Sequence, residues 1–487
     1  MTNTDTHSAS LVKRYRSLVD SPSDFEAAMH TAPSRFFWVH PLRTSPETLC
    51  PLLRRDGYHL ETLPWQPGGF RVQGQGQGLG RHWAYHAGLF HIQDAASMMP
   101  ARLLDPAPGH QVLDLCAAPG NKTAQLSLSL LNTGTVVAND YDAQRLRPLV
   151  RNVTRLGLLN VSTTQHNGTD YPPESGPFDR ILVDAPCSGE GTARRHPHLL
   201  QRKRRPSDVL QSVQYELLRR AVCLCRVGGR IVYSTCTFAP EENERVVNAV
   251  LGAFSGRVRL LSAHRKGLPT SPGVTHWRED VFDERLEKTA RIWPHLNDTD
   301  GFYMALMEKV DETPPAIQGG FDTKRTCQRS PLYESLQAKA SVQNVLSARF
   351  GIPAKALETL RLVFKSEKHV HAVARDHRPP PGPLVTLGLP LLNLRLRFPK
   401  LTTAGALAVG HWATRNVVDV DEDQAYAYLE RRSLLLSARQ RSGCRGDGYV
   451  LVRHKEYVLG VGLLFEDRAE VLSYYPKAFA LPPRRPA

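Results

Sequence analysis

The central part of the chain alternates short apolar runs with longer amphipathic stretches. The apolar runs predict buried strands, and the amphipathic stretches between them predict helices. Strands separated by helices of this length indicate βαβ units and a parallel sheet. Such sheets bind ligands outside the carboxyl ends of their strands, so the loops that follow the strands are the first place to look for a site. The predicted strands lie in VLDL (112–115), TVVAND (135–140), VSTTQHN (161–167), FDRILVDAPC (178–187) and RIVYSTC (230–236).

The N-terminal end shows a different pattern. SPSDFEAAMHTAP (21–33) and QDAASMMPARLL (93–104) predict helices, the first with capping residues at its start. RFFWVHP (35–41) and GGFRVQ (68–73) predict short strands. These elements indicate a small α+β domain before the parallel sheet.

Beyond about residue 310 the composition changes again. A linker rich in Pro, Gly and Thr precedes residues 340–373, which we expect to be mainly helical and basic. The residues from there to 487 mix short strands and helices, so we expect the C-terminal region to be α+β and rich in strands. The predicted domains are an N-terminal domain (1–100), a catalytic domain (101–312), a helical basic linker domain (313–383) and a C-terminal domain (384–487).

Composition narrows the class of protein and its partners. The 487 residues include 62 Lys and Arg against 47 Asp and Glu, and the net charge of +15 favours an anionic partner, nucleic acid first. The eight cysteines show neither a C-x-x-C pair nor a zinc-type spacing, so we expect no metal and no disulfide framework. The N-terminus lacks the apolar core of a signal peptide, and no apolar run approaches the ~18 residues that span a bilayer. We expect a cytoplasmic monomer without membrane contact.

The loop after the first predicted strand has the character of a nucleotide pocket. LDLCAAPGNKT joins that strand to a helix start through small residues and Gly120, which lets the backbone come close to a ligand. The phosphate loop of NTPases needs two glycines where this loop has one. Asp140 ends the second strand, where an acid typically accepts hydrogen bonds from ribose hydroxyls. The pattern favours an adenosine cofactor without a pyrophosphate, and a tight turn beside a solvated acid is the alternative.

Two cysteines and one acid follow neighbouring strands. Asp184 ends one strand and Cys187 comes just after it, while Cys236 ends the next. A thiolate is a strong nucleophile but needs activation by its site. Carbon 5 of a pyrimidine becomes nucleophilic only after a thiolate adds at carbon 6, and an acid at the ring nitrogen takes up the developing charge. The set therefore predicts methyl transfer to carbon 5, although a lone cysteine would more often be a core residue.

LDLCAAPGNKT, VDAPCSGEGT and STCTFAPEENE resemble three motifs of the Nol/Nop/Sun family of RNA cytosine-5 methyltransferases, in the family's order and spacing. FHIQDAASMM before them and RIWPHLNDTDGFYMALMEK after them are also similar to family segments, so the likeness covers about residues 85–310. It implies a Rossmann-like, S-adenosylmethionine-dependent methyltransferase domain. In the implied catalytic set Cys236 is the nucleophile, Cys187 serves product release, and Asp184 and Lys122 assist. The implied cofactor contacts are Cys116, Ala117, Ala118, Pro119, Gly120, Asn121, Lys122, Asp140, Asn167 and Asp184.

The chain departs from the family pattern at three places. Asn121 stands where the family usually has a second glycine, and Asn167 stands where it usually has an aspartate. An asparagine can still accept a hydrogen bond from the adenine edge, so cofactor binding need not be lost. The family's arginine–asparagine strand near the N-terminus is missing from RFFWVHPLRTS, so our expectation that residues 1–100 form an RNA-binding α+β domain does not rest on that strand.

Two segments bear on the substrate. ARRHPHLLQRKRRPS (193–207) carries six Arg or Lys and no acid directly after the Cys187 loop, which favours phosphate anchoring over a merely solvated helix. The target base must be unstacked or single-stranded, as in RNA loops. GYVLVRHKEYVLGVGLLFEDRAEVLSYYPKAF (448–479) is similar to the PUA-like RNA-binding ending of the family's bacterial small-subunit ribosomal enzymes. We therefore expect ribosomal RNA as the partner rather than transfer RNA.

Three other functions are open at this point. The substrate could be transfer RNA, or the chain could be an RNA-binding ribosome assembly factor without catalysis. In DNA cytosine methyltransferases the nucleophile sits in the Pro-Cys motif, which would move the attack to Cys187. Amino-group methyltransferases use an Asp/Asn-Pro-Pro-aromatic loop, and DAPC (184–187) does not match it.

Overall fold

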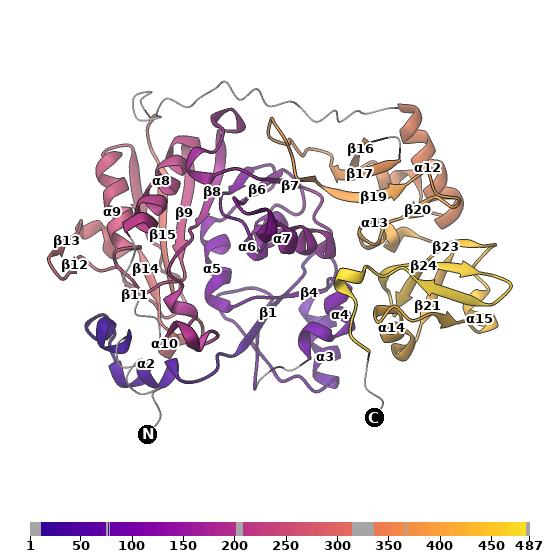
Figure 1. The fold of residues 1–487 in the computed structure, drawn as a ribbon, viewed down its shortest axis with the longest axis horizontal. Coiled ribbons are helices and arrows are strands. Elements are labelled where there is room, and N and C mark those ends of the chain that lie inside the picture. Colours follow the sequence, from indigo (N-terminus) through magenta and orange to yellow (C-terminus); the bar gives the residue numbers. More distant parts are fainter. Residues whose placement is uncertain are drawn as a thin grey trace.

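The computed structural model describes residues 11–74, 76, 78–200, 208–313, 336–364, 366 and 368–483 (Figure 1). A large sheet forms the centre, with a small N-terminal unit and two further sheets built from the C-terminal part of the chain. Residues 201–207 of the basic run and 314–335 of the expected linker lie outside the described residues.

The central sheet has ten strands. They are β5 (Gln111–Asp114), β6 (Thr135–Asn139), β7 (Val161–Thr164), β8 (Phe178–Asp184), β9 (Cys225–Thr235), β10 (Val258–Leu261), β11 (Ser271–Pro272), β14 (Ala290–Ile292), β15 (Phe302–Lys309) and β18 (Thr386–Leu387). Their order is β11-β14-β15-β9-β8-β5-β6-β7-β18, with β10 paired to β15. The five predicted strands correspond to β5–β9, and all pairs among them are parallel, which confirms the predicted α/β class.

Helices cover both faces of the parallel strands. One buried cluster joins Val112 and Leu182 to α5 (Ala95–Leu104), α6 (Asn121–Ser129) and α7 (Ala143–Leu156). The other joins Leu113 and Val183 to α8 (Asp208–Leu224) and α9 (Glu244–Ala253). Because neighbouring residues of a strand point to opposite faces, a strand covered on both sides must be apolar throughout. This is why most of the predicted strands stand out as apolar runs, whereas β7 buries Ser162, Thr163 and Thr164.

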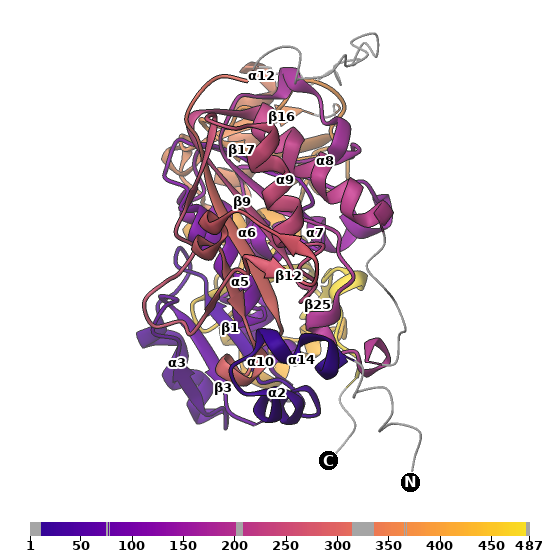
Figure 2. The same ribbon diagram turned by 90° about the vertical axis from the view of Figure 1, so that its left-hand side faces the viewer.

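The N-terminal unit is a four-stranded antiparallel sheet with flanking helices. Its strands, in the order β2-β3-β1-β4, and its helices are β1 (Arg35–Val39), β2 (Leu60–Thr62), β3 (Gly69–Val72), β4 (Phe90–Ile92), α2 (Pro22–Met29), α3 (Pro46–Arg55) and α4 (Trp83–His86). α2 lies beside α10 (Pro294–Asn297) of the central part (Figure 2). The Phe25 ring there packs edge-on against Phe238 and Trp293 at 5.4 and 5.6 Å between centroids. A two-stranded hairpin, β12 (His276–Trp277) and β13 (Asp280–Val281), completes this side.

The C-terminal part contains two sheets. The first has the order β16-β17-β19-β20 and the second β21-β23-β24-β25-β22. Their strands are β16 (Leu360–Phe364), β17 (His369–Ala374), β19 (Leu389–Asn393), β20 (Lys400–Leu401), β21 (Val417–Val420), β22 (Leu434–Leu435), β23 (Gly448–His454), β24 (Tyr457–Phe465) and β25 (Glu470–Ser473). The helices of this part are α12 (Leu336–Phe350), α13 (Thr403–Val409), α14 (Glu422–Leu429) and α15 (Ala438–Arg441).

The expectation that residues 340–373 are mainly helical was wrong for their second half. α12 ends at Phe350, and the runs LRLVF and HVHAVA form the antiparallel strands β16 and β17. Branched apolar residues at buried positions suit a pleated surface better than a helix. Since β16 and β17 precede residue 383 and β19 and β20 follow it, one sheet extends across the expected boundary between the last two domains.

The C-terminal part is attached to the edge of the central sheet. β18 pairs antiparallel with β7, and Thr386 and Thr163 are aligned in this pair. The His377 ring nitrogen Nε2 lies 2.7 Å from the Ser162 hydroxyl, and the Asp376 carboxylate accepts from the Gly134 N–H at 2.6 Å. These bonds hold the C-terminal part in a fixed place against the catalytic domain.

A buried ion pair fixes β14 against α9. The Arg291 guanidinium donates to both oxygens of Glu244, and the two side chains are 2% and 0% exposed. Replacing Arg291 with Met would leave the Glu244 charge buried and unpaired, which costs about 3–5 kcal/mol. We expect the melting temperature measured by calorimetry to fall by roughly 10 °C. Arg285→Met, which breaks the exposed pair with Asp283, is the control and should change it by less than about 2 °C; equal shifts for both variants would contradict the prediction.

Candidate active site

The carboxyl ends of β5, β8 and β9 bring the predicted catalytic residues together. β8 and β9 pair in register so that Asp184 lies beside Ser234. The Asp184 carboxylate accepts a hydrogen bond from the Ser234 hydroxyl at 2.8 Å and from the Lys122 ammonium at 2.7 Å. Lys122 is buried at the start of α6 and lies 5.2 Å above the Phe302 ring. The acid is thus held by two donors in a fixed orientation, with its side chain 28% exposed.

The two cysteines lie in contact at this edge. The Sγ atoms of Cys187 and Cys236 are 3.2 Å apart, and the Gly191 N–H donates to the Cys236 carbonyl at 2.9 Å. The hydrogen bond with Cys236 and then burial raise the pKa of the Cys187 thiol well above its usual value, and the nearby Glu242 carboxylate acts in the same direction. Cys187 therefore holds its proton at neutral pH, with its sulfur in contact with that of Cys236.

Glu242 and Gln214 support the Cys187 loop, and the sequence did not single them out. The Ser188 N–H and the Gln214 side-chain amide both donate to one oxygen of Glu242 at 2.9 Å, and Gln214 also donates to the Pro186 carbonyl at 2.8 Å. The other Glu242 oxygen is buried without a partner among the described residues. The acidic run EENE after Cys236 was the available signal, but an acidic helix start more often serves as a helix cap.

The loop between β5 and α6 has the form that the small residues predict. Gly120 has φ +97°, and a Cβ atom there would lie 3.0 Å from the Leu149 backbone, so only glycine fits. Asp140 is buried at the end of β6, where it accepts from the Ala118 N–H and the Asp142 N–H at 3.1 Å each. The acid thus ties this loop to the end of β6.

The remaining predicted cofactor residues are spread over this region. Asn121 bonds through its side-chain oxygen to the His91 ring at 3.0 Å, which links α6 to the N-terminal unit and gives this departure from glycine a structural role. Asn167 is exposed and caps a short turn through the Thr169 N–H at 3.2 Å. Burial raises the pKa of the Cys116 thiol well above its usual value, so Cys116 is not a nucleophile at neutral pH. Ala117 and Pro119 contribute backbone to the loop.

Asp114 lies behind this loop and is also part of its support. Thr123 donates to its carboxylate at 2.7 Å, and the second oxygen is buried without a partner among the described residues. Burial raises the pKa of Asp114 to about 7. Its charge therefore changes near neutral pH, unlike that of an exposed aspartate.

The first part of the basic run at 193–207 forms ion pairs within the protein, whereas the sequence favoured phosphate anchoring. Arg194 is buried and bonds to Asp298 at 2.6 Å, so it cannot reach an RNA phosphate. Arg195 bonds to Asp94 and Asp300 at 2.7 Å each. The four other Arg and Lys residues of the run lie outside the described residues.

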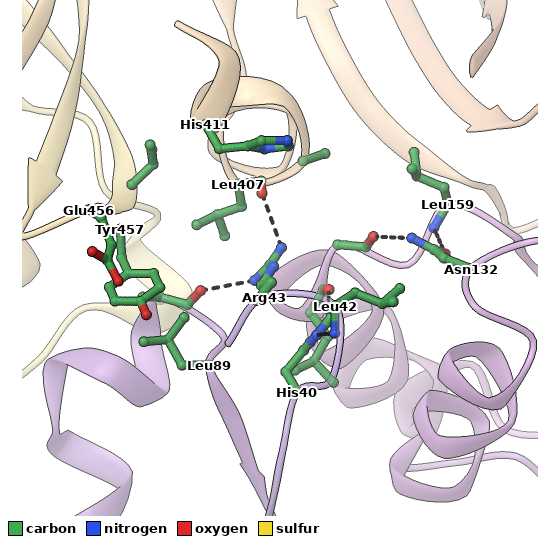
Figure 3. Close-up of a pocket in the computed structure, with 15 residues that line it drawn as sticks. His40, Leu42, Arg43, Leu89, Asn132, Leu159, Leu407, His411, Glu456 and Tyr457 are labelled. Atoms are coloured by element: carbon green, nitrogen blue, oxygen red, sulfur yellow. Dashed lines mark hydrogen bonds between the residues drawn. The ribbon is translucent and has the colours of Figure 1, made fainter. Parts of the chain in front are cut away.

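A cavity of about 340 Å³ lies elsewhere, where the N-terminal unit, the end of α7 and the C-terminal part meet (Figure 3). The Arg43 guanidinium crosses it and donates to the carbonyls of Ala87, Arg155 and Leu407, one from each part. The predicted catalytic residues do not line this cavity. Among the described residues, the two thiols and Asp184 come together at the strand ends, which is therefore the candidate site.

Neither metal-binding clusters nor membrane-spanning helices occur in the described residues. No group of three or more His, Cys, Asp or Glu side chains there is arranged to hold a metal ion. No helix in the same ranges is both long and apolar enough to cross a bilayer.

The fold and the strand-end residues define the class of protein. A parallel sheet with a small-residue loop after β5 and a buried acid after β6 is the arrangement of Rossmann-like, S-adenosylmethionine-dependent methyltransferases. The chain superposes on the crystal structure of a methyltransferase homolog protein from Pyrococcus horikoshii with a TM-score of 0.55 and 30% identity, over 64% of this chain and 100% of that one. The predicted fold and cofactor class are confirmed.

The sequence comparison identifies the family. Residues 101–308 match the family described as 16S rRNA methyltransferase RsmB/F. The tRNA (cytosine(49)-C(5))-methyltransferase of Pyrococcus abyssi is 34% identical over 301 residues, which are 61% of this chain and 95% of that one. The chain belongs to the RsmB/F family of RNA methyltransferases, and the resemblance to Nol/Nop/Sun enzymes is confirmed.

Two further relatives differ in how much of the chain they match. The 28S rRNA (cytosine(4447)-C(5))-methyltransferase of Homo sapiens is 36% identical over 287 residues, and this chain spans only 35% of its length. The ribosomal RNA small subunit methyltransferase F of Aeromonas salmonicida is 29% identical over an alignment of 467 residues that covers 91% of this chain and 90% of that one. Only the second of these two matches extends through most of the C-terminal part.

The contact between the sulfur atoms generates a prediction about thiol reactivity. Cys236→Ala removes the first cause of the raised Cys187 pKa, so that pKa should fall. Because the thiolate is the reactive form, alkylation of Cys187 by iodoacetamide should reach its half-maximal rate at lower pH than in the wild type. Peptide mass spectrometry over a pH series measures this. Cys223→Ala, on α8, should leave the profile unchanged, and an unchanged profile in Cys236→Ala would show that the sulfurs do not interact.

Proposed function

We propose that the protein is an S-adenosylmethionine-dependent RNA cytosine-5 methyltransferase that acts in the cytoplasm as a monomer. It forms 5-methylcytosine through a transient bond between Cys236 Sγ and carbon 6 of the target cytosine. The observation that carries this proposal is the pair of thiols 3.2 Å apart beside an acid that is held by Lys122 and Ser234. A single thiol could add to the ring, but a second group is needed to remove the proton from carbon 5 later in the reaction.

The residues around Gly120 fit S-adenosylmethionine. The slot beside Leu149 admits only a glycine, and the Asp140 carboxylate lies where a ribose would be recognised. Tyr141, 74% exposed next to Asp140, offers an aromatic face for the adenine. We assign the cofactor to residues 116–122, Asp140, Asn167 and Asp184. When bound, it supplies an electrophilic methyl group.

The proposed reaction uses the acid and the two thiols in turn. The Cys236 thiolate adds to carbon 6, and the electron pair of the carbon 5–carbon 6 bond becomes available at carbon 5. Asp184, oriented by Lys122, acts in this step in its protonated form, and it donates its proton to the ring nitrogen and so neutralises the negative charge that develops there. Once carbon 5 carries the methyl group, its proton must leave. Once the Cys236 sulfur is bonded to carbon 6 and no longer raises the Cys187 pKa as a neighbouring thiol, Cys187 loses its proton to water and, as a thiolate, accepts the proton from carbon 5. The electron pair left on carbon 5 re-forms the carbon 5–carbon 6 double bond, the sulfur leaves carbon 6 as the Cys236 thiolate, and the ring nitrogen returns its proton to Asp184, which restores the aromatic ring.

We propose small-subunit ribosomal RNA as the substrate. The likeness to the Aeromonas salmonicida ribosomal enzyme covers 91% of this chain, whereas that to the Pyrococcus abyssi transfer RNA enzyme covers 61%. We infer that the longer match includes the C-terminal sheets, and that β23, β24 and the Tyr-Pro-Lys segment at 475–477 make a PUA-like RNA-binding module. Bisulfite sequencing of total RNA from cells with and without the gene tests this. If a 5-methylcytosine disappears from transfer RNA when the gene is absent, transfer RNA is the substrate. If no 5-methylcytosine disappears from any RNA, the result favours an assembly factor without catalysis.

The assignment of the two cysteines predicts a covalent complex. In Cys187→Ala the attack by Cys236 proceeds but release stalls, so a protein–RNA adduct should accumulate and appear as a band that survives denaturing electrophoresis. In Cys236→Ala no adduct should form. Cys223→Ala, which changes a thiol outside this site, should behave as the wild type. The reverse pattern would make Cys187 the nucleophile.

The assignment of the cofactor predicts the effect of removing the acid after β6. Asp140→Ala loses a charge-assisted hydrogen bond to the ribose and the bond that holds the Ala118 N–H. Such a bond is worth about 1.5–3 kcal/mol, so the Kd for S-adenosylmethionine measured by calorimetry should rise about 10- to 100-fold. Asp283→Ala, a surface aspartate, should leave the Kd unchanged. An unchanged Kd in Asp140→Ala would place the cofactor elsewhere.

A further inference from the structure

The segment before α2 lies against the two cysteine loops. Residues 11–15 are helical, and Leu11, Val12 and Tyr15 are buried in the same core cluster as β8, β9 and α8. The Tyr15 ring packs 5.7 Å from Phe238 and stacks on Trp277 at 6.1 Å. The segment is therefore part of the catalytic domain's core, although the sequence separates it from the loops by more than 170 residues.

Tyr15 ends in a hydrogen bond to the Cys187 loop. Its hydroxyl accepts from Arg14 Nε at 2.9 Å and donates to Glu190 Oε2 at 2.5 Å. Arg14 is itself fixed by Glu241, at 3.0 Å, in the loop after Cys236. Burial raises the pKa of Glu190, while the Tyr15 bond and the Arg14 charge favour its ionised form.

Glu190 connects this hydroxyl to both cysteine loops. Thr237 donates to the same Glu190 oxygen at 3.3 Å, and the hydroxyls of Thr237 and Ser188 are 2.7 Å apart. Because the single Thr237 proton goes to Glu190, Ser188 is the donor in that last bond. Thr237 directly follows Cys236, and Ser188 directly follows Cys187. The chain of bonds therefore joins the two residues that directly follow the cysteines.

We propose that Tyr15 and Glu190 are positioning residues that hold the Cys187 and Cys236 loops at the separation that the reaction needs. The inference rests on the proposed function, because it concerns the same two thiols. It assigns a role in catalysis to the N-terminal segment, which contributes no thiol or acid to the reaction. A hydroxyl bridge suits this task since it fixes distance and direction, whereas the apolar packing around it fixes only approximate contact.

The first test measures kinetics of Tyr15→Phe and Glu190→Ala with tritiated S-adenosylmethionine and RNA from cells that lack the gene. A misplaced thiol slows the chemical steps, so kcat should fall about 10- to 100-fold. The KM for S-adenosylmethionine should stay within about twofold, because the proposed cofactor residues make none of these bonds. Glu190→Gln keeps a side-chain oxygen that can accept both bonds and should restore part of the lost kcat.

The matched control is Tyr428→Phe. Tyr428 is fully buried in the C-terminal part and donates its hydroxyl to the Val461 carbonyl at 3.0 Å, so the variant loses a comparable bond far from the thiols. Its kcat should equal that of the wild type. A kcat within twofold of the wild type for both Tyr15→Phe and Glu190→Ala would overturn the proposal, as would an equal loss in Tyr428→Phe.

The second test is independent of activity. The charged and titratable groups that act most strongly on the Cys187 thiol are Cys236 and Glu242, and the buried Tyr233 also interacts with it. If the bridge sets the distance between the sulfur atoms, Tyr15→Phe and Glu190→Ala should shift the alkylation profile of Cys187 to lower pH, as Cys236→Ala does. Unchanged profiles would overturn the positioning role. Should the wild type methylate no RNA, the proposed function fails while this profile still decides whether the bridge holds the loops.

Discussion

The structure depends on the parallel pairing of β8 with β9. The register that sets Asp184 beside Ser234 also sets the two following loops side by side, and this brings the Cys187 and Cys236 sulfur atoms to 3.2 Å. A shift of one residue would turn every side chain of a strand to the opposite face, so this register is fixed by the buried apolar residues on both sides of the sheet. The chemistry of the site is thus a consequence of core packing.

Burial controls the charge of the groups around these thiols. A buried thiol or carboxyl is harder to ionise, and the fixed donors nearby decide which of them carries a charge. Cys187 keeps its proton against Cys236 and Glu242, whereas Asp184 faces an ammonium and a hydroxyl. The two groups therefore lie in different surroundings, although they are only three residues apart in the sequence.

The units outside the catalytic sheet are joined to it by specific bonds and not only by linkers. Tyr15 reaches the Cys187 loop, β18 extends the sheet beyond β7, and Arg43 joins carbonyls of three parts of the chain. Glycines at 88 and 157 leave room for the Arg43 guanidinium, since a Cβ atom at either would overlap it. An RNA held by the C-terminal sheets would therefore meet the thiols in a defined geometry.

The sequence by itself determined the parallel strands β5–β9, the glycine slot at Gly120 and the residues Asp184, Cys187 and Cys236, because apolar runs, turn chemistry and short motifs are local properties. It did not reveal β16 and β17, whose apolar runs fit a helix or a strand equally well until a partner strand is known. Nor did it reveal Glu242, Gln214, Glu190 and Tyr15 as supports of the thiols. Their roles come from contacts between distant parts of the chain, such as the 175 residues between Tyr15 and Glu190. Only the tertiary structure decides such contacts, since they arise when separate elements pack into one core.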